Sequence, residues 1–124
     1  MAKYRPVETS LGVISGRDAI YLDEITLVIA ERKLVLRGEF NGHLCSKRTH
    51  GFIPYELIFH RVSDHKLTDL NQFGFERGVS SFDEIVGTGA PKEFLVRTYD
   101  DVLEVVCDGY QLVVLSDDPP RAQG

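Results

Sequence analysis

The segment RTYDDVLEVVCDGYQLVVLSDD, residues 97–118, limits the fold more than any other part of the chain. Apolar side chains alternate on both sides of Asp108-Gly109, a dipeptide typical of the two-residue type I′ turn of a β-hairpin. A hairpin that turns there places Val105 opposite Leu112, and directly opposed residues lie on one face of a sheet. The sequence therefore predicts a C-terminal hairpin whose core face carries Leu103, Val105, Cys107, Tyr110, Leu112 and Val114.

The same register brings together the acidic residues at the open end of this hairpin. Asp101 falls opposite Ser116 and Asp100 falls opposite Asp117, with Asp118 adjacent. Four carboxylates so close repel one another unless water, a cation or a basic partner neutralises them. One interpretation is a set of solvated loops, and the other is a site for a divalent cation or a basic protein, although the spacing fits no EF-hand loop. The candidate acidic patch consists of Asp100, Asp101, Asp117 and Asp118.

The net charge of −5 has its origin in this segment. Residues 1–97 hold 13 basic and 13 acidic side chains, whereas residues 98–118 hold six acidic side chains and no basic one. Arg121 supplies the last positive charge. Because affinity for nucleic acid depends on a basic face, we expect no nucleic-acid partner. A basic protein is the partner that this charge favours.

Further strands are predicted upstream by alternation between turn signals. Glu24–Arg48 has the pattern of a three-strand meander with turns at Glu31-Arg32 and Asn41-Gly42. Phe52–Val62 and Glu93–Tyr99 are rich in the branched and aromatic residues typical of two more strands. The face of the meander that we expect inside consists of Ile25, Leu27, Ile29, Leu34, Leu36, Phe40 and Cys45.

One segment breaks the strand pattern. Ser81 and Glu84 have the spacing of a capping box, and Gly87 follows the apolar residues after them. This pattern predicts one short helix near residues 81–87 that lies against the sheet. The expected fold class is mainly β, an antiparallel sandwich or open barrel of about seven to eight strands. We expect a single domain over residues 1–116 and a flexible tail over residues 117–124.

No motif indicates catalysis or cofactor binding, so no catalytic, cofactor-binding or metal-binding residue is assigned. GVISG departs from the G-x-S-x-G pattern of a nucleophilic serine, and GTGAPK lacks the Gly-Lys-Ser/Thr of a phosphate-binding loop. His43, Cys45 and His50 are a cluster of soft metal ligands, but structural zinc sites combine two such halves. Because the predicted register puts Cys45 in the core, we expect this cysteine to be a small apolar side chain.

The chain has no run of about 20 apolar residues for a membrane helix and no apolar signal core, and its two cysteines are typical of thiols in a reducing compartment. We therefore expect a cytoplasmic protein with no membrane partner and no cofactor. The expected function is that of a small non-catalytic interaction module, such as an acidic inhibitor or immunity-type protein that covers a basic partner. The alternatives are a β-barrel that binds a small apolar ligand and an enzyme whose site forms only in three dimensions. The oligomeric state stays open.

Overall fold

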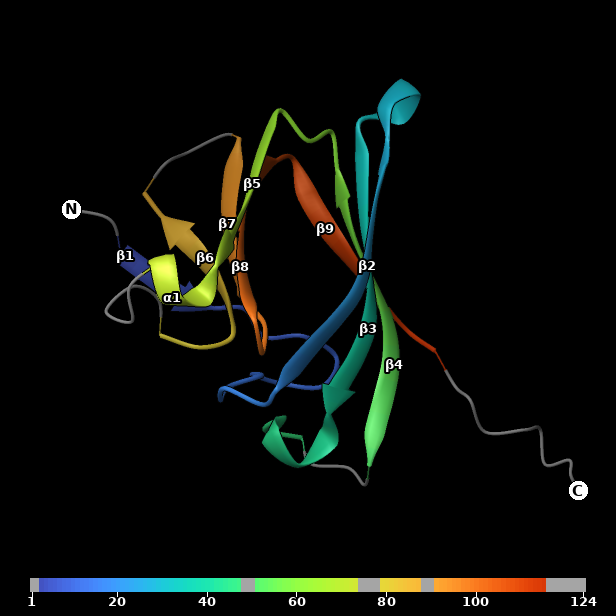
Figure 1. Cartoon of the computed structure of the whole chain (residues 1–124). Helices are drawn as coiled ribbons and strands as arrows, with labels where there is room; N and C mark the ends of the chain where they lie inside the picture. The colour runs from blue at the N-terminus through green and yellow to red at the C-terminus, as the bar shows by residue number, and fades with distance from the viewer. Residues whose placement is uncertain (1–2, 48–50, 74–78, 88–90, 116–124) are drawn as a thin grey trace, which may run out of the picture.

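The computed structural model describes residues 3–47, 51–73, 79–87 and 91–115, which form two antiparallel β-sheets packed face to face (Figure 1). The five-stranded sheet has the order β1-β6-β7-β8-β5, and the four-stranded sheet has the order β2-β3-β4-β9. Within the described residues each sheet ends in its own edge strands. Of the two architectures expected from the sequence, the protein therefore adopts the sandwich and not the open barrel. The mainly β, antiparallel fold class predicted from the sequence is confirmed.

The strand bounds follow the chain from one sheet to the other and back. The five-stranded sheet contains β1 (Lys3–Pro6), β5 (Asp64–Asp69), β6 (Phe82–Val86), β7 (Lys92–Arg97) and β8 (Asp101–Cys107). The four-stranded sheet contains β2 (Ile20–Val28), β3 (Lys33–Asn41), β4 (Phe52–His60) and β9 (Gly109–Val114). The helical elements are α1 (Leu70–Phe73) and the two 3-10 turns η1 (Ile29–Glu31) and η2 (Gly42–Leu44).

An apolar core fills the space between the sheets. Its aromatic centre is Phe59 from β4, Phe82 from β6 and Phe94 from β7, with ring centroids 5.6 to 6.2 Å apart. Tyr110 from β9 meets Phe82 edge to face at 5.1 Å. These rings come from four strands and both sheets, so the core holds the two layers together through edge-to-face and tilted aromatic contacts.

The predicted hairpin at the C-terminal end is wrong, although five of the six residues predicted for its core face lie in or against the core; the sixth, Val114, is 39% exposed. β8 pairs with β5 and β7, whereas β9 pairs with β4 in the other sheet. Neither Asp108 nor Gly109 has the positive φ that a type I′ turn needs, and the chain crosses between the sheets at this point. Val105 lies opposite Phe94 rather than Leu112. The predicted core residues Leu103, Val105 and Cys107 are buried, and Tyr110 and Leu112 pack against the same core.

The predicted meander is right in its first strand pair and wrong in its third strand. β2 pairs with β3 so that Leu27 lies opposite Leu34, two residues from the predicted register, because η1 occupies the turn and leaves Ile29 73% exposed. After β3 the residues of η2 form no hairpin, and the next strand to pair with β3 is β4. A slip of two residues keeps each side chain on its face. Of the residues predicted to lie inside, Leu34, Leu36, Phe40 and Cys45 are buried and Ile25 packs against the core, whereas Leu27 is 42% exposed.

The predicted helix near residues 81–87 is also wrong, because Phe82–Val86 is strand β6, paired with β1 and β7. A short apolar run does not separate a strand from a helix by its periodicity. In place of the expected Glu84, the carboxylate of Asp83 accepts hydrogen bonds from the N–H groups of Val79 (2.7 Å) and Ser80 (3.1 Å). These bonds fix the turn that leads into β6.

The α-helix of the described chain is α1, on the outer face of the five-stranded sheet (Figure 1). There Leu70 packs against Leu95 of β7 and Val102 of β8 in a small second cluster. No helix of the described residues is long and apolar enough to cross a membrane. The tail predicted over residues 117–124 lies outside the described residues.

Candidate functional site

Four side chains stack at the end of the sandwich where β2 begins and β7 ends. The guanidinium of Arg17 lies 4.9 Å from the ring centroid of Tyr99, and the ring of Tyr99 stacks on that of Tyr21 with centroids 5.5 Å apart. Phe52 meets Tyr21 edge to face at 5.8 Å. Tyr99 is 38% exposed and Phe52 is 53% exposed. This aromatic ladder, formed by Arg17, Tyr99, Tyr21 and Phe52, therefore presents ring surface to solvent.

One hydrogen bond between the sheets and two close contacts within the four-stranded sheet hold the ladder in place. The N–H of Tyr99 donates to the carbonyl of Ile20 at 2.9 Å, which ties the end of β7 to the start of β2. The carbonyl of Tyr21 accepts a hydrogen bond from the buried hydroxyl of Tyr55 at 2.9 Å. Gly38 of β3 passes so close that an added Cβ would lie 1.9 Å from that same carbonyl oxygen. The ladder therefore rests on strands that cannot shift without breaking core contacts.

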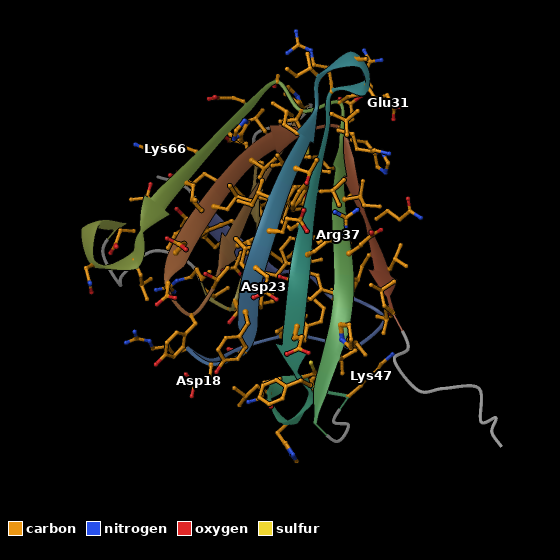
Figure 2. The ribbon with its side chains drawn as sticks, turned by 45° about the vertical axis from the view of Figure 1, so that its right-hand side comes forward. Asp18, Asp23, Glu31, Arg37, Lys47 and Lys66 are labelled. Atoms are coloured by element: carbon orange, nitrogen blue, oxygen red, sulfur yellow. The ribbon has the colours of Figure 1, made fainter. Side chains whose placement is uncertain are left out.

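Four carboxylates flank the ladder. Asp100 and Asp101 directly follow Tyr99, and Asp69 of β5 lies opposite Asp101. Burial raises the pKa of the Asp101 carboxyl, and the neighbouring Asp100 and Asp69 raise it further. Asp18 lies at this same end of the molecule (Figure 2). The acidic–aromatic end is defined as the aromatic ladder together with Asp18, Asp69, Asp100 and Asp101.

The candidate acidic patch from the sequence is placed only in part. Asp100 is exposed and Asp101 is half-buried at this end. Asp117 and Asp118 lie outside the described residues, and the hairpin register that set them opposite the first pair is wrong. That Asp117 and Asp118 lie near Asp100 and Asp101 therefore stays a prediction, and the hairpin pairing that suggested it is not formed.

Sequence reasoning missed the other half of the acidic–aromatic end. Asp69 reaches Asp101 only because β5 is an edge strand that pairs with β8, a long-range pairing that no local pattern indicates. Asp18 lies in the loop before β2, close enough to Tyr21 to raise the pKa of its hydroxyl, although burial is the larger cause. The adjacent letters Arg17-Asp18 and Tyr99-Asp100 are a weak signal that could have drawn attention to both loops.

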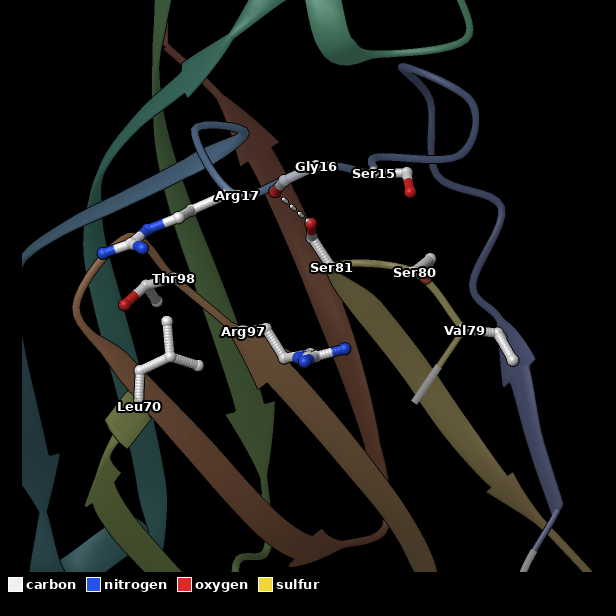
Figure 3. Close-up of a pocket in the computed structure, with 9 residues that line it drawn as sticks. All are labelled: Ser15, Gly16, Arg17, Leu70, Val79, Ser80, Ser81, Arg97 and Thr98. Atoms are coloured by element: carbon white, nitrogen blue, oxygen red, sulfur yellow. Dashed lines mark hydrogen bonds between the residues drawn. The ribbon is translucent and has the colours of Figure 1, made fainter. Parts of the chain in front are cut away.

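A pocket of about 230 Å³ lies beside the ladder (Figure 3). Its buried hydroxyl groups are hydrogen-bonded within the protein, Ser80 to the Asp83 carboxylate at 2.5 Å and Ser81 to the Gly16 carbonyl at 2.9 Å. Asp83 is already engaged in capping the turn before β6. The described lining contains no histidine or cysteine.

Two arginines contribute to this pocket from opposite walls. Arg17 comes from the loop before β2, and Arg97 comes from the end of β7. Figure 3 shows their guanidinium groups pointing away from each other. They therefore do not form one cradle for an anion, and Arg17 instead belongs to the ladder through its contact with Tyr99.

The structure describes two of the three soft metal ligands noted in the sequence. His43 is exposed, Cys45 is 2% exposed, and His50 lies outside the described residues. Among the described residues no three histidine, cysteine or carboxylate side chains are placed to hold a metal ion. Burial raises the pKa of the Cys45 thiol and raises that of Cys107 to about 11. The prediction that Cys45 is a small apolar core residue is confirmed.

Comparison with family models, with curated proteins and with solved structures finds no match to this chain. The chemistry of the acidic–aromatic end is therefore the basis for a functional assignment.

Proposed function

We propose that this protein is a small non-catalytic interaction module that binds a basic protein partner through its acidic–aromatic end. The observation that carries the proposal is the solvent-exposed aromatic ladder beside four carboxylates. The two parts have different roles in binding, and each has a physical basis.

The ladder supplies contact area. Tyrosine and arginine are enriched among the residues that dominate binding energy at interfaces, because each buries a large, flat group and keeps a polar end. Tyr99 and Tyr21 are already stacked, and Arg17 already lies over Tyr99. A partner that covers these side chains therefore immobilises few new rotamers, which keeps the entropic cost of association low.

The carboxylates supply steering and selectivity. Exposed acidic groups attract a basic surface over a distance of about a Debye length and repel acidic competitors. Burial is the main cause of the raised pKa of the Asp101 carboxyl, and repulsion from Asp100 and Asp69 adds to it. A lysine or arginine of the partner relieves that repulsion on binding. The free protein gains nothing comparable from these charges, because exposed charges are strongly screened by water.

The catalytic and small-ligand alternatives have less support. The pocket beside the ladder has a volume of about 230 Å³, below the roughly 300–1,000 Å³ typical of small-molecule sites. The larger hollow at the opposite end, of about 710 Å³, is lined mainly by charged and polar side chains, which do not suit an apolar ligand. Its buried serine hydroxyls are hydrogen-bonded internally. We also place the protein in the cytoplasm, because Cys45 and Cys107 are free, buried thiols, as is usual in a reducing compartment.

The test is affinity capture at low and at high ionic strength, followed by measurement of the dissociation constant with the purified partner. Tyr99→Ala removes the centre of the ladder, and Asp100→Asn removes one charge. Each has a matched control at the opposite end of the sandwich: Ile29→Ala, also an exposed apolar residue, and Asp64→Asn, also an exposed acid.

We expect the partner to be basic, to bind more weakly as salt rises, and to bind Tyr99→Ala about tenfold or more weakly than the parent. Asp100→Asn should weaken binding by about threefold, and both controls should bind like the parent. Capture of no basic protein at low ionic strength, or equal losses in the controls and the site variants, would contradict the proposal.

A further inference from the structure

The opposite end of the sandwich holds a feature that the proposed function does not use. Three connections meet there, at the top of Figure 1: the turn between β2 and β3, the link between β4 and β5, and the link between β8 and β9. They surround a hollow of about 710 Å³, lined by Arg32, Arg61 and Asp108, one from each connection, and by Glu31 beside Arg32. Both sheets contribute, so the hollow exists only in the folded protein.

Arg32 and Arg61 have an unusual backbone conformation. Their φ angles are 53° and 56°, and within the described residues they are the only non-glycine residues with positive φ. This left-handed region costs an L-residue about 1 kcal/mol, and glycine or asparagine occupies it more easily. Glycine would fit both turns with less strain. The presence of arginine at both positions therefore indicates a role for the two side chains at the hollow.

Main-chain hydrogen bonds fix the walls of the hollow. The N–H of Val62 donates to the carbonyl of Arg32 at 2.8 Å, which joins the first two connections. The N–H of Asp108 donates to the carbonyl of His60 at 2.9 Å, which joins the second and third. The two arginines therefore project from turns that are tied to each other across the sandwich.

The charges around the hollow leave one cation uncompensated. Arg61 Nε lies 3.1 Å from Asp108 Oδ2, and Glu31 lies 3.3 Å from Lys33, which follows Arg32 in the chain. No carboxylate of the described residues lies within ion-pair distance of the Arg32 guanidinium. The Arg61–Asp108 pair is weak, because its side chains are 81% and 59% exposed. A stronger anion can therefore take Arg61 from Asp108.

We propose that this hollow binds a phosphate group, held by the guanidinium groups of Arg32 and Arg61. The planar guanidinium donates paired hydrogen bonds to phosphate oxygens, and charged pairs of this kind are about twice as strong as neutral hydrogen bonds. Asp108 is the built-in competitor for Arg61. The site therefore differs from general charge attraction in its dependence on position: removing the carboxylate of Asp108 strengthens binding more than removing the same charge elsewhere on the surface, and removing Arg32 weakens it.

The experiment titrates inorganic phosphate into the full chain and follows the backbone amide signals of residues 32, 62 and 108 by NMR. Sodium chloride at equal ionic strength is the blank. Arg32→Gln and Asp108→Asn are the test variants. Lys47→Gln and Glu39→Gln are the matched controls, since both residues are exposed, carry the same charges and lie at the other end of the strands.

We expect saturable shifts in the parent, about tenfold or more weakening in Arg32→Gln, and up to about fivefold tightening in Asp108→Asn. The controls should match the parent. Shifts that chloride reproduces, equal weakening in Lys47→Gln, or no tightening in Asp108→Asn relative to Glu39→Gln would overturn the proposal. Saturable binding of citrate without binding of phosphate would also overturn it, because a carboxylate site would then be present.

Discussion

β8 and β9 follow each other in the chain with only Asp108 between them, and both carry apolar residues in alternation, yet they occupy different positions in the sandwich. β8 is hydrogen-bonded on both sides, to β5 and to β7, whereas β9, among the described strands, pairs only with β4 at the edge of the other sheet. Val105 of β8 is 1% exposed, and Val114 of β9 is 39% exposed. The same residue pattern thus produces full burial in one strand and partial burial in the next.

The difference separates two kinds of information. Alternation fixes which side chains face the core, because successive residues of a strand point to opposite faces. The depth of burial depends on what lies on either side of the strand and on the facing sheet, and those neighbours are distant in the sequence. Equivalent substitutions in the two strands therefore measure how much of the stability comes from position in the sheet.

The largest expected contrast is between Val105→Asp and Val114→Asp. The first buries a carboxylate without a partner in the core and should lower the free energy of unfolding by about 4 kcal/mol or more. The second puts a carboxylate on a partly exposed edge position and should lower it by about 1 kcal/mol or less. Urea denaturation followed by circular dichroism measures both. Equal losses would show that β9 is as deeply packed as β8.

Thiol reactivity sharpens the same contrast. Cys107 is 0% exposed, and burial raises its pKa to about 11 against an ordinary value of 9.0, which leaves about 100-fold less thiolate at neutral pH. We expect Cys107 to react with a chromogenic disulfide reagent about 100-fold or more slowly than a cysteine introduced by Gln111→Cys on the exposed face of β9. Rapid labelling of Cys107 in the folded protein would contradict this burial.

Amide hydrogen exchange tests the hydrogen bonding of the two strands. From Val102 onwards the amides of β8 face a neighbouring strand, whereas alternate amides of β9 face the edge of the sheet in the described part of the chain. The amides of β8 should exchange only through opening of the sandwich, and half of those in β9 should exchange at rates closer to those of a loop. Uniform protection along β9 in NMR exchange spectra would indicate a partner strand at that edge.

The smallest effect is expected for Asp101→Asn at the start of β8. Because the folded-state pKa of Asp101 is raised above its ordinary value of 3.8, the folded protein holds this proton more tightly than the unfolded chain. Its charge therefore costs stability that is fully felt at neutral pH, fades as pH falls through the raised folded-state pKa towards 3.8, and is absent at lower pH. Asp101→Asn should raise the melting temperature slightly at neutral pH and have no effect in acid. Destabilisation at neutral pH would point to an unrecognised favourable contact.

The acidic residues show how far the sequence leads towards the candidate site. The charge count drew attention to Asp100 and Asp101, and both lie at the acidic–aromatic end. The same count gave no reason to include Tyr21 or Phe52, since a ring that packs in the core and a ring that stacks in solvent look alike in a strand pattern. Asp69 could not be anticipated, because its neighbour Asp101 is 32 positions away and the strand that carries Asp69 was not predicted.

The sequence by itself determined that the chain is mainly antiparallel β and which side chains point inward, as Leu34, Leu36, Leu103, Val105 and Cys107 do. Those features depend on the two-residue period of a strand, which any short window contains. Only the tertiary structure decided that β8 and β9 belong to different sheets, that Phe82–Val86 is a strand, and that Tyr99 meets Tyr21. Strand pairing depends on contacts between segments that are distant in the sequence. The entropy lost in closing the loop between two such segments, and the packing gained, cannot be read from any short stretch of residues.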